Sequence, residues 1–374
     1  PRLTWSWAAP RVLTGELTAL VRFHYERARS KIIIGSTPTA ESGDVQDDEI
    51  RNGSALAAAL QSRFSLWERL HITPGLRLES FWSDRRIVRA PQTTGSGAST
   101  LGADVDVFGG AYSYALIPGL GVAADVAGPL TLYAGAHRGY APPRTQDAVG
   151  PSGENLNLDP ELSWNFELGA RLRLGRWLSA DVSGFHIEFQ NQIIPPSQAG
   201  ATVSGGAFNA GHSRHSGLEA GVTFDPAALL PLERAGLALP LTVNYTYLPL
   251  AAFVGGRFDG NRLPYAPEHL LYAQLRLAHR SGASAQVGLT YVSAQFADRE
   301  NTLAPSRDGL LGEVPGYAVL DARVAYAIRR AGLTLYLAGK NLTNQVYIAS
   351  RAPEGIQPAG YLQLFGGVEG AWSR

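Results

Sequence analysis

Hydrophobic and polar positions alternate with a period of two along much of the chain. The pattern is clearest between Leu162 and Leu174, where every even position is Leu, Trp, Phe or Ala and the odd positions include Glu167 and Arg171. Such alternation predicts a β-strand with one apolar and one polar face. The segment is about twice as long as an average globular strand of about five or six residues. The strand therefore needs an apolar environment on one face and a polar environment on the other along its whole length.

The same alternation recurs along the chain, and no segment competes convincingly as an amphipathic helix. Even the Ala-rich segment 54–67 can be interpreted as a strand, because the neighbouring segments are predicted strands. Counting the segments predicts about fourteen strands. They cover approximately 12–28, 54–67, 70–88, 111–127, 130–140, 162–174, 178–190, 214–224, 238–248, 269–279, 285–295, 317–328, 333–344 and 361–372.

The connections between these strands alternate in length, and 225–237 is an exception as a somewhat long turn on the short side. This regularity predicts a transmembrane antiparallel β-barrel, which has short turns on its periplasmic side and long loops outside. A tilted strand of about 9–11 residues crosses a membrane, and a closed barrel leaves no unpaired edge in lipid. A soluble all-β protein is the alternative, but it has no reason to place its long loops at one end. The short connections are 68–69, 128–129, 175–177, 280–284 and 329–332, and the long ones are 29–53, 89–110, 141–161, 191–213, 249–268, 296–316 and 345–360.

Composition narrows the function classes. The chain has 32 Lys and Arg against 32 Asp and Glu, so its formal net charge is zero. It therefore lacks the excess of positive charge that is typical of proteins that bind nucleic acid. The absence of Cys excludes a disulfide framework and a thiolate metal site. No run approaches the ~18 apolar residues of a membrane helix.

The first residues alternate as well, with Leu3, Trp5 and Trp7 on one face. They predict the tail of a fifteenth strand. Because bacterial single-chain barrels have even strand numbers, we expect residues 1–374 to be the C-terminal portion of a larger barrel. The lack of Met and of a signal-peptide pattern at Pro1 agrees with that expectation.

Several segments in a fixed order resemble the C-terminal barrel of TonB-dependent outer-membrane receptors. Each motif is weak alone, but together they are specific. Within that family, "GYAPPRTQDA" is similar to ferric-citrate and siderophore receptors. The segments are "LYAGAHRGYAPPRTQDA" (132–148), "LDPELSWNFELGAR" (158–171), "FNAGHSRHSGLEAGV" (208–222), "LPYAPEH" (263–269), "PGYAVLDARVAY" (315–326) and "GKNLTNQVYIASR" (339–351).

The resemblance implies a 22-stranded barrel with a plugged lumen, of which this chain supplies about fourteen strands. The N-terminal plug, the energy-coupling box and the first strands are then expected upstream of Pro1. The implied function is import of a ferric chelate, a siderophore or ferric citrate, across the outer membrane of a Gram-negative bacterium. The implied partners are the TonB–ExbB–ExbD energy-coupling complex, outer-membrane lipids and an iron(III) chelate as transported ligand, with no permanently bound cofactor.

Candidate site residues follow from their expected positions. An Arg at the outer mouth can clamp an anionic chelate, because a guanidinium binds carboxylates in a bidentate manner, although an ordinary polar loop is the alternative. The His-x-x-His pair at 212 and 215 lacks a third ligand fixed by spacing, so we predict no metal site. The expected ligand contacts are Arg138, Arg144, Gln146, His212, Arg214 and His215, and the expected lumen- or plug-facing residues are Glu167, Arg171 and Arg173.

Two other functions remain open at this point. A complete fourteen-stranded barrel would be a passive outer-membrane channel. An outer-membrane hydrolase would need catalytic residues at the rim, and no Ser/His/Asp or paired-carboxylate arrangement can be defended, so we expect the protein not to be an enzyme.

Overall fold

The computed structural model describes residues 1–374 except 10–11, 38, 94–98, 195–207, 210, 231, 233, 353–354 and 371–374. The chain divides into two compact units. Unit 1 comprises Pro1–Gly121, Ala136–Trp164 and Phe189–His212, and unit 2 comprises Val122–Gly135, Asn165–Glu188 and Ser213–Arg374. Each unit is described by itself below.

Strands account for nearly all of the regular structure, which confirms the predicted all-β fold. Fifteen of them form one path in the order β1-β2-β3-β4-β5-β6-β7-β8-β11-β13-β14-β15-β18-β19-β22, and β12 also pairs with β14. Each of the fourteen predicted strands overlaps one strand of this path, and β1 is the fifteenth. The strands of the path are β1 (Arg2–Ala9), β2 (Leu13–Ile34), β3 (Asp44–Leu66), β4 (Leu70–Thr93), β5 (Ser99–Ala127), β6 (Leu130–Ala141), β7 (Glu161–Leu174), β8 (Leu178–Gln190), β11 (His212–Phe224), β13 (Leu241–Val254), β14 (His269–His279), β15 (Ala283–Val292), β18 (Tyr317–Ile328), β19 (Leu333–Lys340) and β22 (Gln363–Gly370).

The remaining elements are short and lie in the connections. They are α1 (Thr145–Ala148), the 3₁₀ helices η2 (Pro226–Ala228), η3 (Gly256–Phe258) and η4 (Arg329–Ala331), and the short strands β9 (Ile193–Ile194), β10 (Phe208–Asn209), β12 (Leu237–Ala238), β16 (Gln295–Phe296), β17 (Glu313–Val314), β20 (Ile348–Ala352) and β21 (Gly355–Pro358). Within the described part of the chain, no helix has the length and apolar character needed to cross a membrane.

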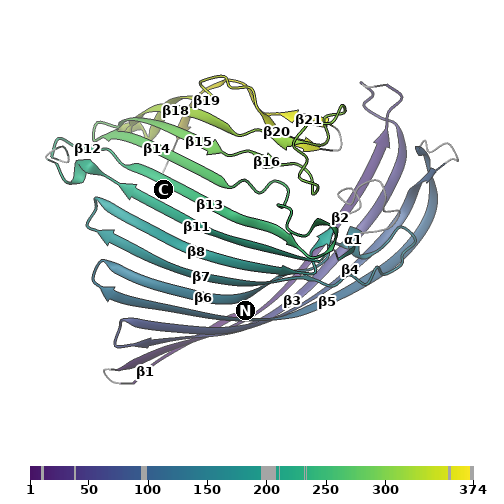
Figure 1. Cartoon of the computed structure of the whole chain (residues 1–374), viewed down its shortest axis with the longest axis horizontal. Coiled ribbons are helices and arrows are strands. Elements are labelled where there is room, and N and C mark those ends of the chain that lie inside the picture. The colour runs from purple at the N-terminus through teal and green to yellow at the C-terminus, as the bar shows by residue number, and fades with distance from the viewer. Residues whose placement is uncertain are drawn as a thin grey trace. The chain divides into compact units, whose positions relative to one another are not determined.

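Unit 1 contains strands much longer than a membrane crossing requires (Figure 1). β2, β3 and β4 have 22, 23 and 24 residues, whereas about 9–11 residues span the hydrocarbon. The segments 29–53 and 89–110, expected as long loops, are therefore largely strand: β2 and β3 leave only 35–43 between them, and β4 runs to Thr93. The expectation failed because a strand that extends into water carries polar residues on both faces and loses its alternation.

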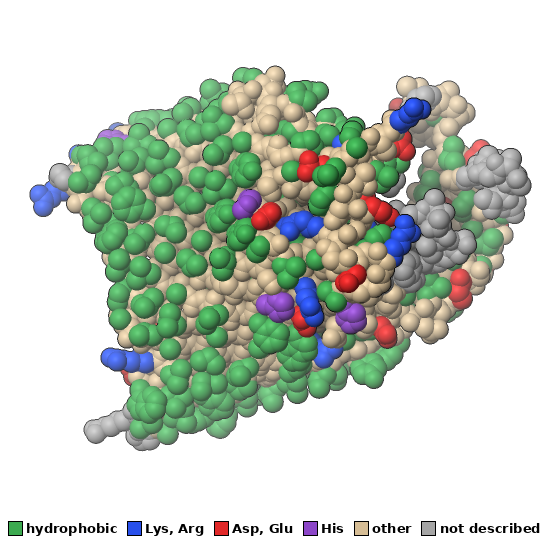
Figure 2. Space-filling view, viewed as in Figure 1, with side chains coloured by type: hydrophobic (Ala, Val, Ile, Leu, Met, Phe, Trp, Pro, Cys, Tyr) green, Lys and Arg blue, Asp and Glu red, His purple; other side chains and the backbone are tan. Residues whose placement is uncertain are grey.

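Unit 2 shows the apolar face by its cross-strand register. Leu275 lies opposite Val287, which lies opposite Ala322. In the next row Val324 lies opposite Leu337. Leu275, Val324 and Leu337 are 47%, 52% and 58% exposed, so the hydrophobic side chains of both rows face outward rather than into a core. In Figure 2, hydrophobic side chains cover this face of the strands, and charged side chains and histidines begin toward the long-loop ends.

The opposite face of unit 2 is polar. Gln274 Nε2 donates to Gln286 Oε1 at 3.4 Å. Arg323 donates to Glu369 at 2.7 Å. These side chains alternate with the outward row, as the period of two requires.

Glycine–aromatic pairs stabilise this polar face. A Cβ at Gly169 would collide with the ring of Tyr133, and one at Gly367 would collide with the ring of Tyr336. Tyr336 lies directly opposite Gly367 in the register. The glycines thus leave room for an aromatic ring to lie across the neighbouring strand, a device that supports twisted sheets.

The surface area follows from these exposed faces. The chain exposes 22818 Å², whereas a compact soluble protein of 39.9 kDa exposes about 14,000 Å². Large hydrophobic side chains such as Leu3, Phe23, Leu168 and Leu364 are 67–71% exposed. Lipid is the environment in which such faces are stable.

Candidate functional site

A cavity in unit 1 is the candidate site, because it contains two of the expected ligand residues. It lies where the connection after β6 folds back against β3 and β4. Pro142 and Pro143 lead into α1, and Arg144 at its N-terminus is extended, with φ −64° and ψ 143°. Proline fixes φ near −65° and cannot donate a backbone hydrogen bond, so the chain enters the helix from an extended arm that keeps Arg144 on the surface.

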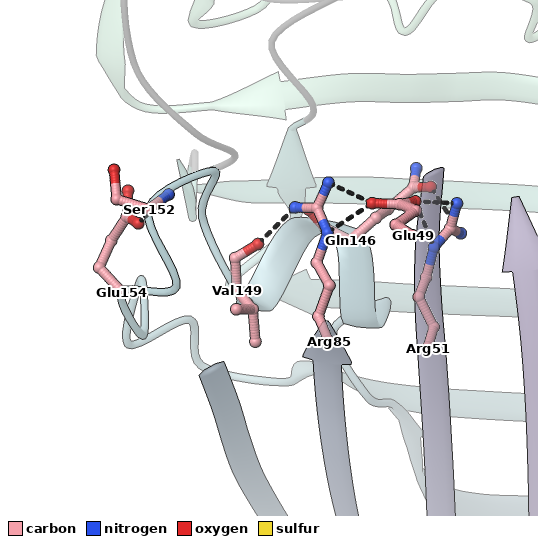
Figure 3. A network of polar contacts seen from close by, with 7 residues as sticks. All are labelled: Glu49, Arg51, Arg85, Gln146, Val149, Ser152 and Glu154. Atoms are coloured by element: carbon pink, nitrogen blue, oxygen red, sulfur yellow. Dashed lines mark hydrogen bonds and ion pairs between the residues drawn. The ribbon is translucent and has the colours of Figure 1, made fainter. Parts of the chain in front are cut away.

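A charged network anchors α1 to the strands. Glu49 is 4% exposed and accepts from Arg51 Nε at 2.6 Å and from Arg85 Nε at 2.7 Å. Arg51 and Arg85 lie directly opposite each other on β3 and β4, a pairing of like charges that would be destabilising without the carboxylate between them. Figure 3 shows how the two guanidinium groups then reach α1. Arg51 donates to Gln146 Oε1 at 3.0 Å, and Arg85 donates to the Val149 carbonyl at 2.7 Å.

The cavity beside this network has a volume of about 480 Å³ and is lined by Glu26, Arg51, Phe81, Arg144 and Gln146, among others. That size falls within the usual range of ligand sites, about 300–1,000 Å³. Arg144 Nε donates to the buried Asp147 carboxylate at 2.6 Å, while the Arg144 side chain remains 62% exposed. The lining offers two guanidinium groups, one amide and the Glu26 carboxylate. Arg51 is paired with Glu49 and Arg144 with Asp147, and the remaining guanidinium N–H groups can donate to an oxygen-rich ligand.

The structure therefore brings together two of the expected ligand residues, Arg144 and Gln146, and adds Arg51. Sequence reasoning missed Arg51 because 29–53 was expected to be a loop. The sequence does contain a signal for this residue: Glu49 and Arg51 are two positions apart, so their side chains lie on the same face if the segment is a strand.

The other expected ligand residues lie elsewhere. In unit 1, Arg138 lies over the Trp164 ring at 5.7 Å, and His212 is exposed. In unit 2, Arg214 Nε donates to Glu188 at 3.0 Å, and His215 Nε2 is 3.4 Å from Ser213 Oγ. None of these four lines the cavity around Arg51, and their ligand role stays a prediction.

The expected lumen residues lie on the polar face of β7 in unit 2. Arg171 Nε donates to Asp181 at 2.8 Å and its guanidinium lies over the Tyr133 ring at 5.5 Å. Tyr133 also donates to Asp181 at 2.6 Å. Glu167 and Arg173 are exposed on the same strand, and contact of these residues with a plug stays a prediction.

Loops of unit 2 are tied together by buried polar groups. Arg351 is 9% exposed and donates to the carbonyls of Gly309 at 2.7 Å and Glu313 at 3.2 Å. The Tyr265 hydroxyl donates to the Arg351 carbonyl at 2.6 Å. These bonds join the connections after β13, β15 and β19.

Ser306 and the Leu310 amide donate to Asp308, and both bonds lower the pKa of that carboxyl.

Metal binding finds no support among the described residues, which contain no group of three or more His, Cys, Asp or Glu placed to hold an ion. The pair at 212 and 215 therefore gains no third ligand there.

The apolar outward face, the polar opposite face and the long-loop ends are those of a transmembrane β-barrel. The chain belongs to the family described as "TonB dependent receptor-like, beta-barrel", whose profile matches residues 2–342. The family consists of outer-membrane receptors and transporters.

Similar proteins agree with that family. The chain is 25% identical over 235 residues to the "Iron-regulated outer membrane virulence protein" of Vibrio cholerae serotype O1 (strain ATCC 39541 / Classical Ogawa 395 / O395). The aligned region covers 58% of this chain and 33% of that protein. The ferric citrate transporter FecA in its unliganded form has a TM-score of 0.77 and 24% identity, and the ferric-catecholate import receptor Fiu from Escherichia coli K12 has a TM-score of 0.77 and 17% identity. Each comparison covers 98% of this chain and 53% of the solved structure. These likenesses establish the fold, and the chain spans about half the length of the receptors it resembles.

Proposed function

We propose that the chain is the barrel portion of an outer-membrane receptor that imports an iron(III) chelate, a siderophore or ferric citrate, with energy supplied through TonB. The observation that carries the proposal is the cavity of unit 1, where Arg51, Arg144 and Gln146 converge on a space sized for a small ligand. Ferric chelates present carboxylate, catecholate or hydroxamate oxygens, and guanidinium groups bind such oxygens by charge-assisted hydrogen bonds.

The names of the similar proteins support the same class of ligand. FecA is named for ferric citrate and Fiu for ferric catecholate, and the Vibrio relative is iron-regulated. In this proposal the plug and the TonB-contacting segment belong to parts of the receptor other than these 374 residues. Glu167, Arg171 and Arg173 then face the plug from the barrel wall, and the TonB–ExbB–ExbD complex is the energy-coupling partner.

The test is uptake of radioactive iron by cells that carry the full-length gene in a receptor-deficient background. Cells are supplied with ferric citrate, a catecholate chelate or a hydroxamate chelate, with and without a protonophore. We expect one chelate class to restore uptake and the protonophore to abolish it. Uptake that persists with the protonophore would instead indicate a passive channel, and failure of all chelates would overturn the ligand assignment.

A further inference from the structure

Glu26, on β2, is the one acidic residue among the described residues that line the cavity of unit 1. Its environment differs from that of the two guanidinium groups of the lining. Arg51 is paired with Glu49, and Arg144 is paired with Asp147. Both cations of the lining therefore already have a carboxylate partner on the chain.

The Glu26 carboxylate has no comparable partner. His24, two residues earlier on the same face of β2, has its Nε2 atom 3.7 Å from Glu26 Oε2, which is too long for a hydrogen bond. In the part of the chain that the structure describes, Glu26 forms no ion pair with a lysine or an arginine, and its side chain is 65% exposed. The carboxylate is therefore available to a cation that a ligand brings.

Gly53 leaves a space beside this carboxylate. Glu26 lies opposite Gly53, and Gly53 lies opposite Ser83, in one row across β2, β3 and β4. A Cβ at Gly53 would lie 3.1 Å from Glu26 Oε1 and 3.3 Å from Phe81 Cε2. The carboxylate and the aromatic ring therefore converge on the space that a side chain at position 53 would fill.

The backbone at Gly53 does not require a glycine. Gly53 lies inside β3, and its φ is not positive, so other residues can adopt the same conformation. A glycine inside a strand weakens the strand and often marks a place where a ligand or another backbone approaches closely. Because Gly53 itself lines the cavity, the space above it is part of the ligand site.

We propose that the chelate that binds in this cavity carries a protonated amine, which lies over Gly53 and donates its N–H groups to Glu26. The methylene group next to the nitrogen contacts the Phe81 ring, because an alkylammonium has an apolar stem below its charged head. The oxygens of the chelate lie on the side of the cavity formed by the connection after β6. There the free N–H groups of Arg144 and Gln146 donate to them.

The charges of the lining distinguish two classes of chelate. A polycarboxylate chelate without an amine, such as ferric citrate, would place a like charge beside Glu26, and such a juxtaposition disfavours the wrong partner. A chelate that carries an amine complements the carboxylate as well as the guanidinium group of Arg144. This inference rests on the proposed function, because it names the class of chelate that the same cavity takes.

The test measures binding to the full-length receptor, purified in mild detergent, by isothermal titration calorimetry. The probes are a ferric trihydroxamate, a ferric tricatecholate and a ferric α-hydroxycarboxylate, each made once with a pendant primary amine and once with that amine acetylated. The variants are Glu26→Gln, which removes the charge, and Gly53→Ala, which places a methyl group in the space. Glu16→Gln is the matched control, because Glu16 lies on the same face of β2 and does not line the cavity.

We expect the unmodified receptor to bind the amine form of one chelate about three- to tenfold more tightly than its acetylated form, as for a partly exposed charge pair. Glu26→Gln should remove this preference, Gly53→Ala should weaken binding of the amine form about threefold or more, and Glu16→Gln should match the parent.

Three results would overturn the proposal: equal binding of the two forms of every chelate that binds, a preference that persists in Glu26→Gln, or unchanged binding by Gly53→Ala. Each of them would leave the proposed function intact, because a chelate would still bind. Failure of all six probes to bind would overturn the proposed function itself, so the two failures are distinguishable.

Discussion

Single residues in the cavity of unit 1 differ in how strongly they are fixed. Arg51 is held by the buried Glu49 and by Gln146, so its side chain helps to position α1 as well as to line the cavity. Arg144 has a buried partner in Asp147 but remains largely in solvent. Arg144 can therefore contact a ligand, and be substituted, without loss of a contact that holds the fold together. It is the better residue for testing ligand binding.

We predict that Arg144→Ala in the full-length receptor weakens chelate binding about three- to tenfold, or roughly 1 kcal/mol for an exposed charge-assisted bond. The loss should be largest at low ionic strength, because steering by surface charge is screened by salt. Arg144→Glu should bind more weakly still, since it adds repulsion. Chelate titrations at two salt concentrations measure both effects. Arg86→Ala is the matched control, because the Arg86 side chain is 55% exposed, donates to Asp106 at 2.6 Å and does not line the cavity. Binding by both Arg144 variants that equals the parent at every salt concentration would remove Arg144 from the site.

At the scale of elements, alternation was enough to predict the fold wherever a strand lies between two unlike environments. It identified fourteen strands and the tail of a fifteenth. It failed on the outer extension of β3, where Glu49 and Arg51 lie before the predicted strand 54–67, and so it missed part of the candidate site. It also could not predict the loop contacts, because Tyr265 and Arg351 are separated by 86 positions and no local pattern links them.

Neighbouring positions of β14 test the assignment of the two faces. Leu275 is outward and Gln274 is on the polar face beside Gln286, and both lie near the middle of the strand. An outward Arg near the bilayer midplane costs roughly 2–4 kcal/mol, whereas lumen substitutions mainly change selectivity. We therefore predict that Leu275→Arg strongly reduces assembled receptor in the outer membrane and that Gln274→Arg does not. The amount of folded receptor, measured by its heat-dependent electrophoretic mobility, distinguishes them. Equal tolerance at the two positions would mean that the faces are assigned wrongly.

At the scale of the whole molecule, the sequence of long and short connections fixes sidedness. Successive antiparallel strands reverse direction, so every second connection lies at the same ends of the strands. The connections 67–69, 128–129, 175–177, 280–282 and 329–332 are short, whereas 142–160 and 293–316 are long. In a membrane barrel the long set is extracellular.

The absence of Cys from the chain allows this sidedness to be measured one position at a time. We predict that Ser152→Cys and Arg307→Cys, in two long connections, react with a membrane-impermeant maleimide on intact cells. Arg176→Cys and Ser281→Cys, in two short turns, should react only after the outer membrane is permeabilised. All four side chains are exposed, so a difference in labelling reports the side of the membrane rather than burial in the protein. Labelling of Arg176→Cys on intact cells, or protection of either long-loop position, would contradict the assignment, because a strand that crosses the bilayer must carry its two ends to opposite sides.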